Sequence, residues 1–247
     1  MSHAIPNAFF RPILRSNNGS AVAIPKGDGK IHLTGDTGKA KLLCQSCEAR
    51  LNEDFDKPLV DCLRELDRQI LKTGFSACIS FSHDRLARCI ASVLWRGCIS
   101  TAEMYRDVKL TASDEHKLFQ LMIGNDEDAL RQSSVGLLRL YDPTPGGFSQ
   151  DVVSNLVFRM SAYEVRAHDK PNISHYALDM CVQGFLVHLF IPKLPYKQAR
   201  QPRYLKRGGR VVHAPPTNIL CYPPLMEMMV TGLAKTQTGQ ITPAVKR

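Results

Sequence analysis

The chain contains 247 residues, of which 44% are hydrophobic and 22% are charged. This length and composition are typical of a globular protein with one large core or two smaller ones. No apolar run approaches the ~20 residues that span a bilayer, and the first residues lack the basic and then apolar layout of a signal peptide. We therefore expect no membrane partner and a cytoplasmic location.

The net charge of +9 is concentrated near the C-terminal end. Residues 193–247 hold ten Lys or Arg and one acidic residue, Glu227, whereas residues 1–192 hold 22 residues of each sign. The excess positive charge is therefore a property of the last 55 residues and not of the whole fold.

The first 40 residues predict little regular structure. Residues 7–10 are apolar and predict a helical turn, which Pro12 is expected to limit because proline lacks a backbone donor. Residues 16–39 are rich in Gly, Ser, Asn and Asp, with short apolar stretches at 21–24 and 31–33. This pattern predicts a loop and hairpin region with weak strands.

Three helices are predicted next. Residues 56–72 place Leu59, Leu63, Leu66 and Ile70 on one stripe. Residues 82–98 predict a largely buried helix with Ser82 as its N-cap, and residues 113–123 predict a third. Trp95 and Arg96 lie near the end of the second helix, where we expect them to pack and cap a core helix.

The pattern changes after Gly124. Residues 135–140 predict a strand, and residues 176–182 and 185–191 predict a hairpin with its turn at 183–184. Residues 211–233 contain apolar pieces, and residues 236–247 are expected to form a loose end. The expected class is α+β, with a small knuckle and helices in residues 1–124 and a strand-rich region in residues 125–247.

A Cys-x-x-Cys pair, Cys44 and Cys47, lies in the stretch LLCQSCEARLN at 42–52. Two thiolates at this spacing supply half of a tetrahedral zinc site, which needs four ligands. The pair is also compatible with a redox motif or with a turn that binds no metal. We expect all eight cysteines to be thiols or metal ligands, as in a reducing compartment.

Three segments together resemble the ββα-metal core of HNH-type endonucleases. They are SHAIP at 2–6, LLCQSCE at 42–48 and SVLWRGCIS at 92–100. Their order and spacing are similar to those of a group of uncharacterised bacterial HNH-like proteins. The resemblance covers roughly residues 2–124 and implies a small ββα-metal-like knuckle.

The resemblance also implies roles for individual residues. His3 would be the general base that activates water against a phosphodiester, helped by a divalent metal, Mg²⁺ or Mn²⁺. Ser2 stands where the family often has an aspartate ligand, and Glu48 stands where its last metal ligand is usually a histidine. Asn52 would be an orienting amide.

In the same family a second C-x-x-C usually precedes the SHAIP-like segment and completes the zinc site. Cys44 and Cys47 would then be knuckle ligands that lack this partner pair. Three alternatives remain open: the chain begins internally, zinc has been lost in this branch, or His32 or Cys78 completes the site.

The segment 193–210 carries seven basic residues and no acidic one, with Tyr196 and Tyr204 between them. Such a segment suits phosphate neutralisation and base stacking, and Gly208 and Gly209 would allow close backbone approach. The alternative is a solvated loop. The predicted contacts to DNA or RNA are Lys193, Lys197, Arg200, Arg203, Lys206, Arg207 and Arg210.

The sequence contains no P-loop, G-x-S-x-G, G-x-G-x-x-G or H-E-x-x-H motif, so nucleotide-driven and α/β-hydrolase functions are unsupported. The leading hypothesis is an HNH-like protein that acts on nucleic acid by metal-dependent phosphodiester hydrolysis, with a role in phage defence or mobile elements by association. The alternative is a nucleic-acid-binding or structural module without enzymatic activity.

Overall fold

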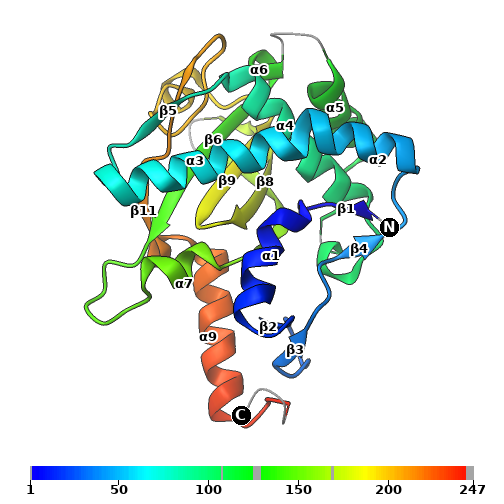
Figure 1. The fold of residues 1–247 in the computed structure, drawn as a ribbon. Coiled ribbons are helices and arrows are strands. Elements are labelled where there is room, and N and C mark those ends of the chain that lie inside the picture. Colours follow the sequence, from blue (N-terminus) through cyan, green and yellow to red (C-terminus); the bar gives the residue numbers. More distant parts are fainter. Residues whose placement is uncertain (1, 107, 125–128, 168–169, 243–247) are drawn as a thin grey trace.

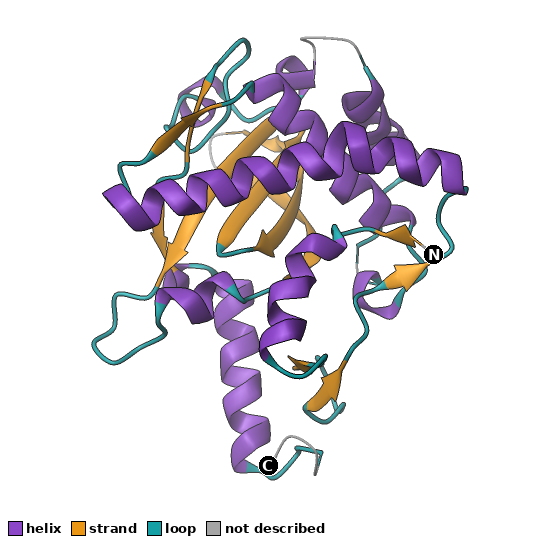
Figure 2. Ribbon diagram, viewed as in Figure 1, coloured by secondary structure: helices purple, strands orange, loops and turns teal. Residues whose placement is uncertain are grey.

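The computed structural model describes residues 2–106, 108–124, 129–167 and 170–242. Helices and strands are mixed along the chain, which confirms the α+β class (Figures 1 and 2). Helices cover a central sheet, and the N-terminal strand lies beside a second short strand at the edge of the molecule (Figure 1). Among the described residues, no helix combines the length and apolar character needed to cross a membrane.

The central sheet has five strands in the order β11-β6-β9-β8-β7. They are β6 (Ser134–Tyr141), β7 (Phe158–Ala167), β8 (Lys170–Val182), β9 (Phe185–Ile191) and β11 (Pro216–Asn218). Only the β11–β6 pair is parallel. The predicted β8–β9 hairpin is confirmed, and Gln183 and Gly184 turn the chain with φ of 51° and 70°. The sequence did not predict β7.

The two faces of the sheet are covered differently. Helices α3 (Lys57–Thr73) and α4 (His83–Ile99) share the larger hydrophobic core with one face, and Figure 1 shows α3 crossing in front of the strands. The other face holds a smaller core with α7 (Gln150–Ser154), the 3₁₀ turn η3 (Ile219–Cys221) and α9 (Pro223–Gln237).

Further helical turns precede the first predicted helix. Helix α2 (Gln45–Leu51) continues through a π-helical turn, η1 (Asn52–Asp56), directly into α3. The helix predicted over 56–72 is confirmed as α3, and the polar turns before it, which show no apolar stripe, were not part of that prediction. The extra residue of a π turn re-aims nearby side chains, and here both Phe55 and Asp56 are buried.

The other two predicted helices are confirmed within a residue or so. The Ser82 side chain caps α4 by accepting from the Arg85 backbone N–H at 3.3 Å. Thr111 caps α5 (Ala112–Ile123) in the same way. A 3₁₀ turn, η2 (Glu103–Tyr105), separates α4 from α5, and a short helix, α6 (Ala129–Gln132), precedes β6.

The N-terminal region contains two small strand pairs. Strand β1 (Ser2–His3) pairs with β4 (Lys39–Ala40), and β2 (Ala21–Ala23) pairs with β3 (His32–Thr34), which confirms the weak hairpin. Helix α1 (Asn7–Ser16) continues past Pro12, contrary to the prediction. Pro12 cannot donate to the Ala8 carbonyl, and Arg64 of α3 donates to that oxygen instead at 3.3 Å.

The C-terminal residues return to the rest of the molecule. Strand β10 (Val211–His213) pairs with β5 (Cys78–Ser80), so residues from both predicted regions form one strand pair. A short helix, α8 (Tyr196–Ala199), precedes it. The larger core also contains residues from both regions. The predicted boundary adjoins residues 125–128, which lie outside the described residues.

The C-terminal end contains a helix that was not predicted, and one expectation for it was wrong. Residues 223–237 form α9, although Val230 and Leu233 are exposed and blur the apolar stripe that would reveal a helix. The predicted loose end is tied down in its first part, because Ile241 bridges to Ile31 and the Thr242 N–H donates to the Ile31 carbonyl at 2.9 Å. Residues 243–247 of this predicted loose end lie outside the described part.

Candidate functional site

The knuckle consists of β1, β4 and the start of α2; helix α1 and the β2–β3 pair lie between the two strands in the chain, and α2 follows β4. Ser2 pairs with Ala40 and His3 with Lys39 across the two strands. The Ser2 hydroxyl is buried and donates to Glu48 Oε2 at 3.1 Å, which joins the first strand to the helix. The structure therefore brings together Ser2, His3 and Glu48. Asn52 is exposed at the first position of the π turn.

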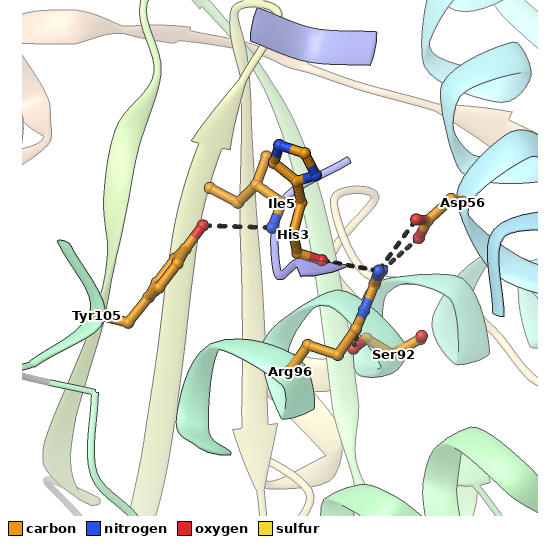
Figure 3. Close-up of polar contacts among 6 residues, drawn as sticks. All are labelled: His3, Ile5, Asp56, Ser92, Arg96 and Tyr105. Atoms are coloured by element: carbon orange, nitrogen blue, oxygen red, sulfur yellow. Dashed lines mark hydrogen bonds and ion pairs between the residues drawn. The ribbon is translucent and has the colours of Figure 1, made fainter. Parts of the chain in front are cut away.

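A buried arginine holds the strand of His3 against the helices (Figure 3). Arg96 of α4 donates to the His3 carbonyl and to Asp56 Oδ2, both at 3.0 Å, and its second terminal nitrogen donates to Asp56 Oδ1. Its Nε donates to the Ser92 carbonyl at 3.2 Å. The Arg96 side chain is 4% exposed, so this ion pair is shielded from water.

The His3 ring is partly buried beside Thr37. Its Nε2 lies 2.9 Å from Thr37 Oγ1. Burial, and then the charge of Lys39, lower the pKa of His3 below its usual value. A lowered pKa leaves the ring neutral at pH 7, which is the protonation state that a general base requires.

The two knuckle cysteines are exposed and adjacent. Cys44 caps α2, and its Sγ accepts from the Cys47 backbone N–H at 3.4 Å and lies 3.2 Å from Ser46 Oγ. The hydrogen bond with Ser46, followed by that with Cys47, lowers the pKa of Cys44 to about 7. The hydrogen bond with Cys44 raises the pKa of Cys47.

The described residues do not form a metal site by themselves. Among them, no three His, Cys, Asp or Glu side chains gather in a group that could hold a metal ion. Neither His32 on β3 nor Cys78 on β5 therefore completes the pair of Cys44 and Cys47. The two thiolates of Cys44 and Cys47 supply only two of the four ligands of a closed zinc site. Near His3, Glu48 supplies one carboxylate.

The basic segment is fastened to the N-terminal end of α4. His83 Nδ1 accepts from the Lys206 N–H at 2.8 Å, and Asp84 Oδ2 accepts from the Gly208 N–H at 2.9 Å. The His83 N–H donates to the Gly209 carbonyl at 2.9 Å. Gly209 approaches the His83 ring so closely that an added Cβ would lie 2.3 Å from Nδ1. The glycine predicted to approach a ligand therefore approaches a histidine.

The predicted nucleic-acid contacts have different surroundings. Lys193 donates to the Leu130 carbonyl at 2.6 Å, and Arg203 donates to the Gln201 side chain. Arg200 lies over the exposed ring of Tyr196, at 5.2 Å. Tyr204 is buried and packs over Gly136, so it is unavailable for the stacking predicted for it. The exposed cations of the segment are Lys193, Lys197, Arg200, Lys206, Arg207 and Arg210.

A groove of about 930 Å³ is lined by residues of α2–η1, α4 and α5 and by Arg210. Four arginines line it, and we call it the arginine groove: Arg50, Arg85, Arg88 and Arg210. Its lining also includes Cys47, so the groove connects the knuckle to the basic segment. Of the seven predicted contacts, only Arg210 belongs to its lining.

The arginines of the groove fall into two groups. Arg50 pairs with Asp54 at 3.4 Å, and Arg88 lies over the Phe55 ring at 5.7 Å while donating to the Met122 carbonyl. Arg85 and Arg210 are exposed, and neither guanidinium has an ion pair within the described residues. Asp84, the second acid of the lining, accepts from the Gly208 N–H through Oδ2, whereas its buried Oδ1 has no hydrogen-bond partner among the described residues.

Sequence reasoning identified Arg210 but not Arg50, Arg85 or Arg88. A signal for two of them was present, because Arg85 and Arg88 are three residues apart on a helix and Trp95 follows Arg88 by seven. Residues with these spacings share a helix face. The groove itself was not predictable from that face, since its other wall comes from the helix after Cys44.

A separate polar cluster lies on the sheet face away from α3 and α4. Asp179 is fully buried, and it accepts from Tyr163 at 2.7 Å and from Tyr222 at 3.0 Å. His188 Nδ1 lies 2.7 Å from its other oxygen. Burial is the main cause that raises the pKa of both tyrosines, with the nearby Asp179 charge adding to it. Both carboxylate oxygens are engaged, so the cluster has the character of a packed internal network.

Comparison with protein-family models, curated proteins and solved structures gives no match. The assignment of a function therefore rests on the geometry of this chain.

Proposed function

We propose that this protein binds nucleic acid through the arginine groove and the adjoining basic segment. The single observation that carries the proposal is the position of Arg85 and Arg210. The two exposed guanidiniums come from distant parts of the sequence and line the same groove. Guanidinium groups bind phosphate oxygens in a bidentate manner, so an arginine-lined groove complements a phosphate backbone.

The attachment of the basic segment to α4 supports the same function. The Lys206 and Gly208 N–H groups donate to the first turn of α4, and the Gly209 carbonyl accepts from it, so this loop is held beside the part of α4 that lines the groove. Lys206 and Arg207 are exposed on that loop. They extend the positive surface beyond the groove, in agreement with the excess charge of the last 55 residues.

The test measures the affinity of the purified chain for a labelled polynucleotide at several salt concentrations. Binding that depends on phosphate contacts weakens steeply with salt. We expect Arg85→Ala and Arg210→Ala each to weaken binding and to reduce the slope of log affinity against log salt by about 1. Arg11→Ala, which removes an exposed cation of α1 outside the groove, is the matched control and should change neither. Affinity that is independent of salt would contradict the proposal.

A second candidate function is phosphodiester hydrolysis with His3 as general base. The observation that favours it is the assembly of the knuckle, in which β1 pairs with β4 and Ser2, next to His3, contacts Glu48 of α2. The lowered pKa of His3 supports the role of a base at pH 7. Incubation with plasmid DNA or RNA and added Mg²⁺ or Mn²⁺ tests it. Cleavage should be lost in His3→Ala, and binding without cleavage favours the non-catalytic module.

A further inference from the structure

The one tryptophan of the chain lines the arginine groove. Trp95 is partly buried on α4, and its ring centroid lies 5.1 Å from that of Phe119 on α5. Met122 and Ile123 continue the same lining, and Ile123 is 44% exposed. One part of the groove therefore presents aromatic and apolar surface to a ligand, which phosphate binding alone does not require.

The aromatic and cationic parts are separated along one helix. Arg85 and Trp95 are ten residues apart on α4, which corresponds to about 15 Å at the helical rise of 1.5 Å per residue. A ligand that uses both parts needs negative charges and a flat apolar face on one extended chain. Unpaired nucleic acid has this combination, since its bases stack on aromatic side chains while its phosphates contact arginine.

Duplex nucleic acid fits the aromatic part less well. Bases in a duplex are stacked on one another, so their faces are not available to Trp95 or Phe119, whereas unpaired bases are free to stack. An acidic peptide would satisfy Arg85 and Arg210 but has no repeated flat face for the aromatic part.

We propose that the arginine groove is selective for a single-stranded segment of nucleic acid, with an unpaired base on Trp95 and Phe119 and neighbouring phosphates on Arg85 and Arg210. This inference rests on the proposed nucleic-acid binding and adds the state of the strand that is bound.

Trp95 supplies the readout, because its fluorescence reports on this groove alone. The intact chain is titrated with a short oligothymidylate, its oligouridylate counterpart, an abasic strand of equal length and the matched duplex. We expect the single strands to quench Trp95 and to bind about tenfold more tightly than the abasic strand, given the usual contribution of one stacked base. The two single strands distinguish a preference for DNA or RNA.

The outcomes separate the two proposals. Equal binding of the single, abasic and duplex strands without quenching would overturn the selectivity and leave nucleic-acid binding in place. Binding of none of them would contradict nucleic-acid binding itself. Equal affinity and equal quenching with polyglutamate would show an acidic-peptide site and would overturn the selectivity as well.

Two variants distinguish a loss of base stacking from a loss of folding. Phe119→Leu retains Trp95 and should weaken binding of the single strand while leaving binding of the abasic strand unchanged. Trp95→Leu, followed by anisotropy of a labelled strand, should have the same effect, and Trp95→Phe should restore most of the difference. A thermal melt of each variant identifies any loss of the fold. Unchanged preference for the single strand in folded Trp95→Leu and Phe119→Leu would overturn the inference.

Discussion

Helix α4 carries arginines on two faces, and their surroundings differ. Arg96 is buried, and all three of its nitrogens donate to Asp56, His3 or Ser92. Arg85 and Arg88 face the arginine groove, where Arg85 is exposed and Arg88 lies over Phe55. An arginine with fixed buried partners holds the fold together, whereas an exposed arginine in a groove retains its donors for a ligand.

The π turn η1 connects these two faces. Asp56, its last residue, pairs with Arg96, and Phe55, the residue before it, lies under Arg88. One irregular turn therefore contacts both the face of α4 that carries the buried Arg96 and the face that lines the arginine groove. These two contacts fix the position of the knuckle helix α2 relative to α4, which bears the groove arginines Arg85 and Arg88.

Removing the buried arginine should have the largest effect on stability. Arg96→Ala leaves Asp56 as a buried carboxylate without its partner, so we expect the free energy of unfolding to fall by about 3–5 kcal/mol. Chemical denaturation measures this loss. The double variant Arg96→Met with Asp56→Leu leaves no unpaired charge and should be less destabilised than Arg96→Ala. A loss below about 1 kcal/mol for Arg96→Ala would show that water reaches Asp56.

Disrupting the contact between the basic segment and α4 should lower the free energy of unfolding by a smaller amount. In Gly209→Ala the new Cβ meets the His83 ring, whose nitrogens are held by the Lys206 N–H and the Val211 carbonyl. Because the site becomes overpacked, we expect the free energy of unfolding to fall by about 1–3 kcal/mol. Nucleic-acid binding should also weaken, because the loop shifts. A double-mutant cycle with His83→Ala should be less than additive. Strict additivity would place the clash elsewhere.

The parts of the fold that local chemistry determines were predictable. Ser82 caps its helix as expected, and Gln183 and Gly184 form the expected hairpin turn. Predictions failed where a residue distant in sequence supplies an interaction that the local sequence cannot make. Helix α1 passes Pro12 because Arg64, 56 residues away from Ala8 in sequence, takes the carbonyl that proline leaves without a donor.

The site was predictable in pieces and not as a whole. SHAIP and LLCQSC indicated residues that meet in the knuckle, where Ser2 contacts Glu48. The groove assembles Arg50, Arg85 and Arg210 from three separate segments, and no local pattern contains that assembly. Charge density pointed to residues 193–210, but tertiary contacts decide that Arg210 enters the groove and that Tyr204 is buried.

The knuckle provides a test of local electrostatics that is measured by thiol reactivity and not by stability. The pKa of Cys44 is about 7 and that of Cys47 is raised, and thiolate is the reactive form. We therefore expect iodoacetamide to modify Cys44 before Cys47, at a rate that increases as the pH rises through about 7. Mass spectrometry of briefly treated protein locates the label. Ser46→Ala should move this increase to higher pH, and preferential labelling of Cys47 would contradict the assignment.

The smallest effect on stability is expected on the open face of α4, and it sharpens the contrast with Arg96. Arg85→Ala removes an exposed side chain without an ion pair among the described residues, so the free energy of unfolding should change by no more than about 0.5 kcal/mol. Chemical denaturation under the conditions used for Arg96→Ala makes the two changes comparable. Because Arg85 is expected to contribute little to stability, a clear loss of nucleic-acid affinity in this variant would show that Arg85 contacts the ligand. A loss of stability comparable to that of Arg96→Ala would instead make Arg85 a structural residue and remove the main support for a binding groove.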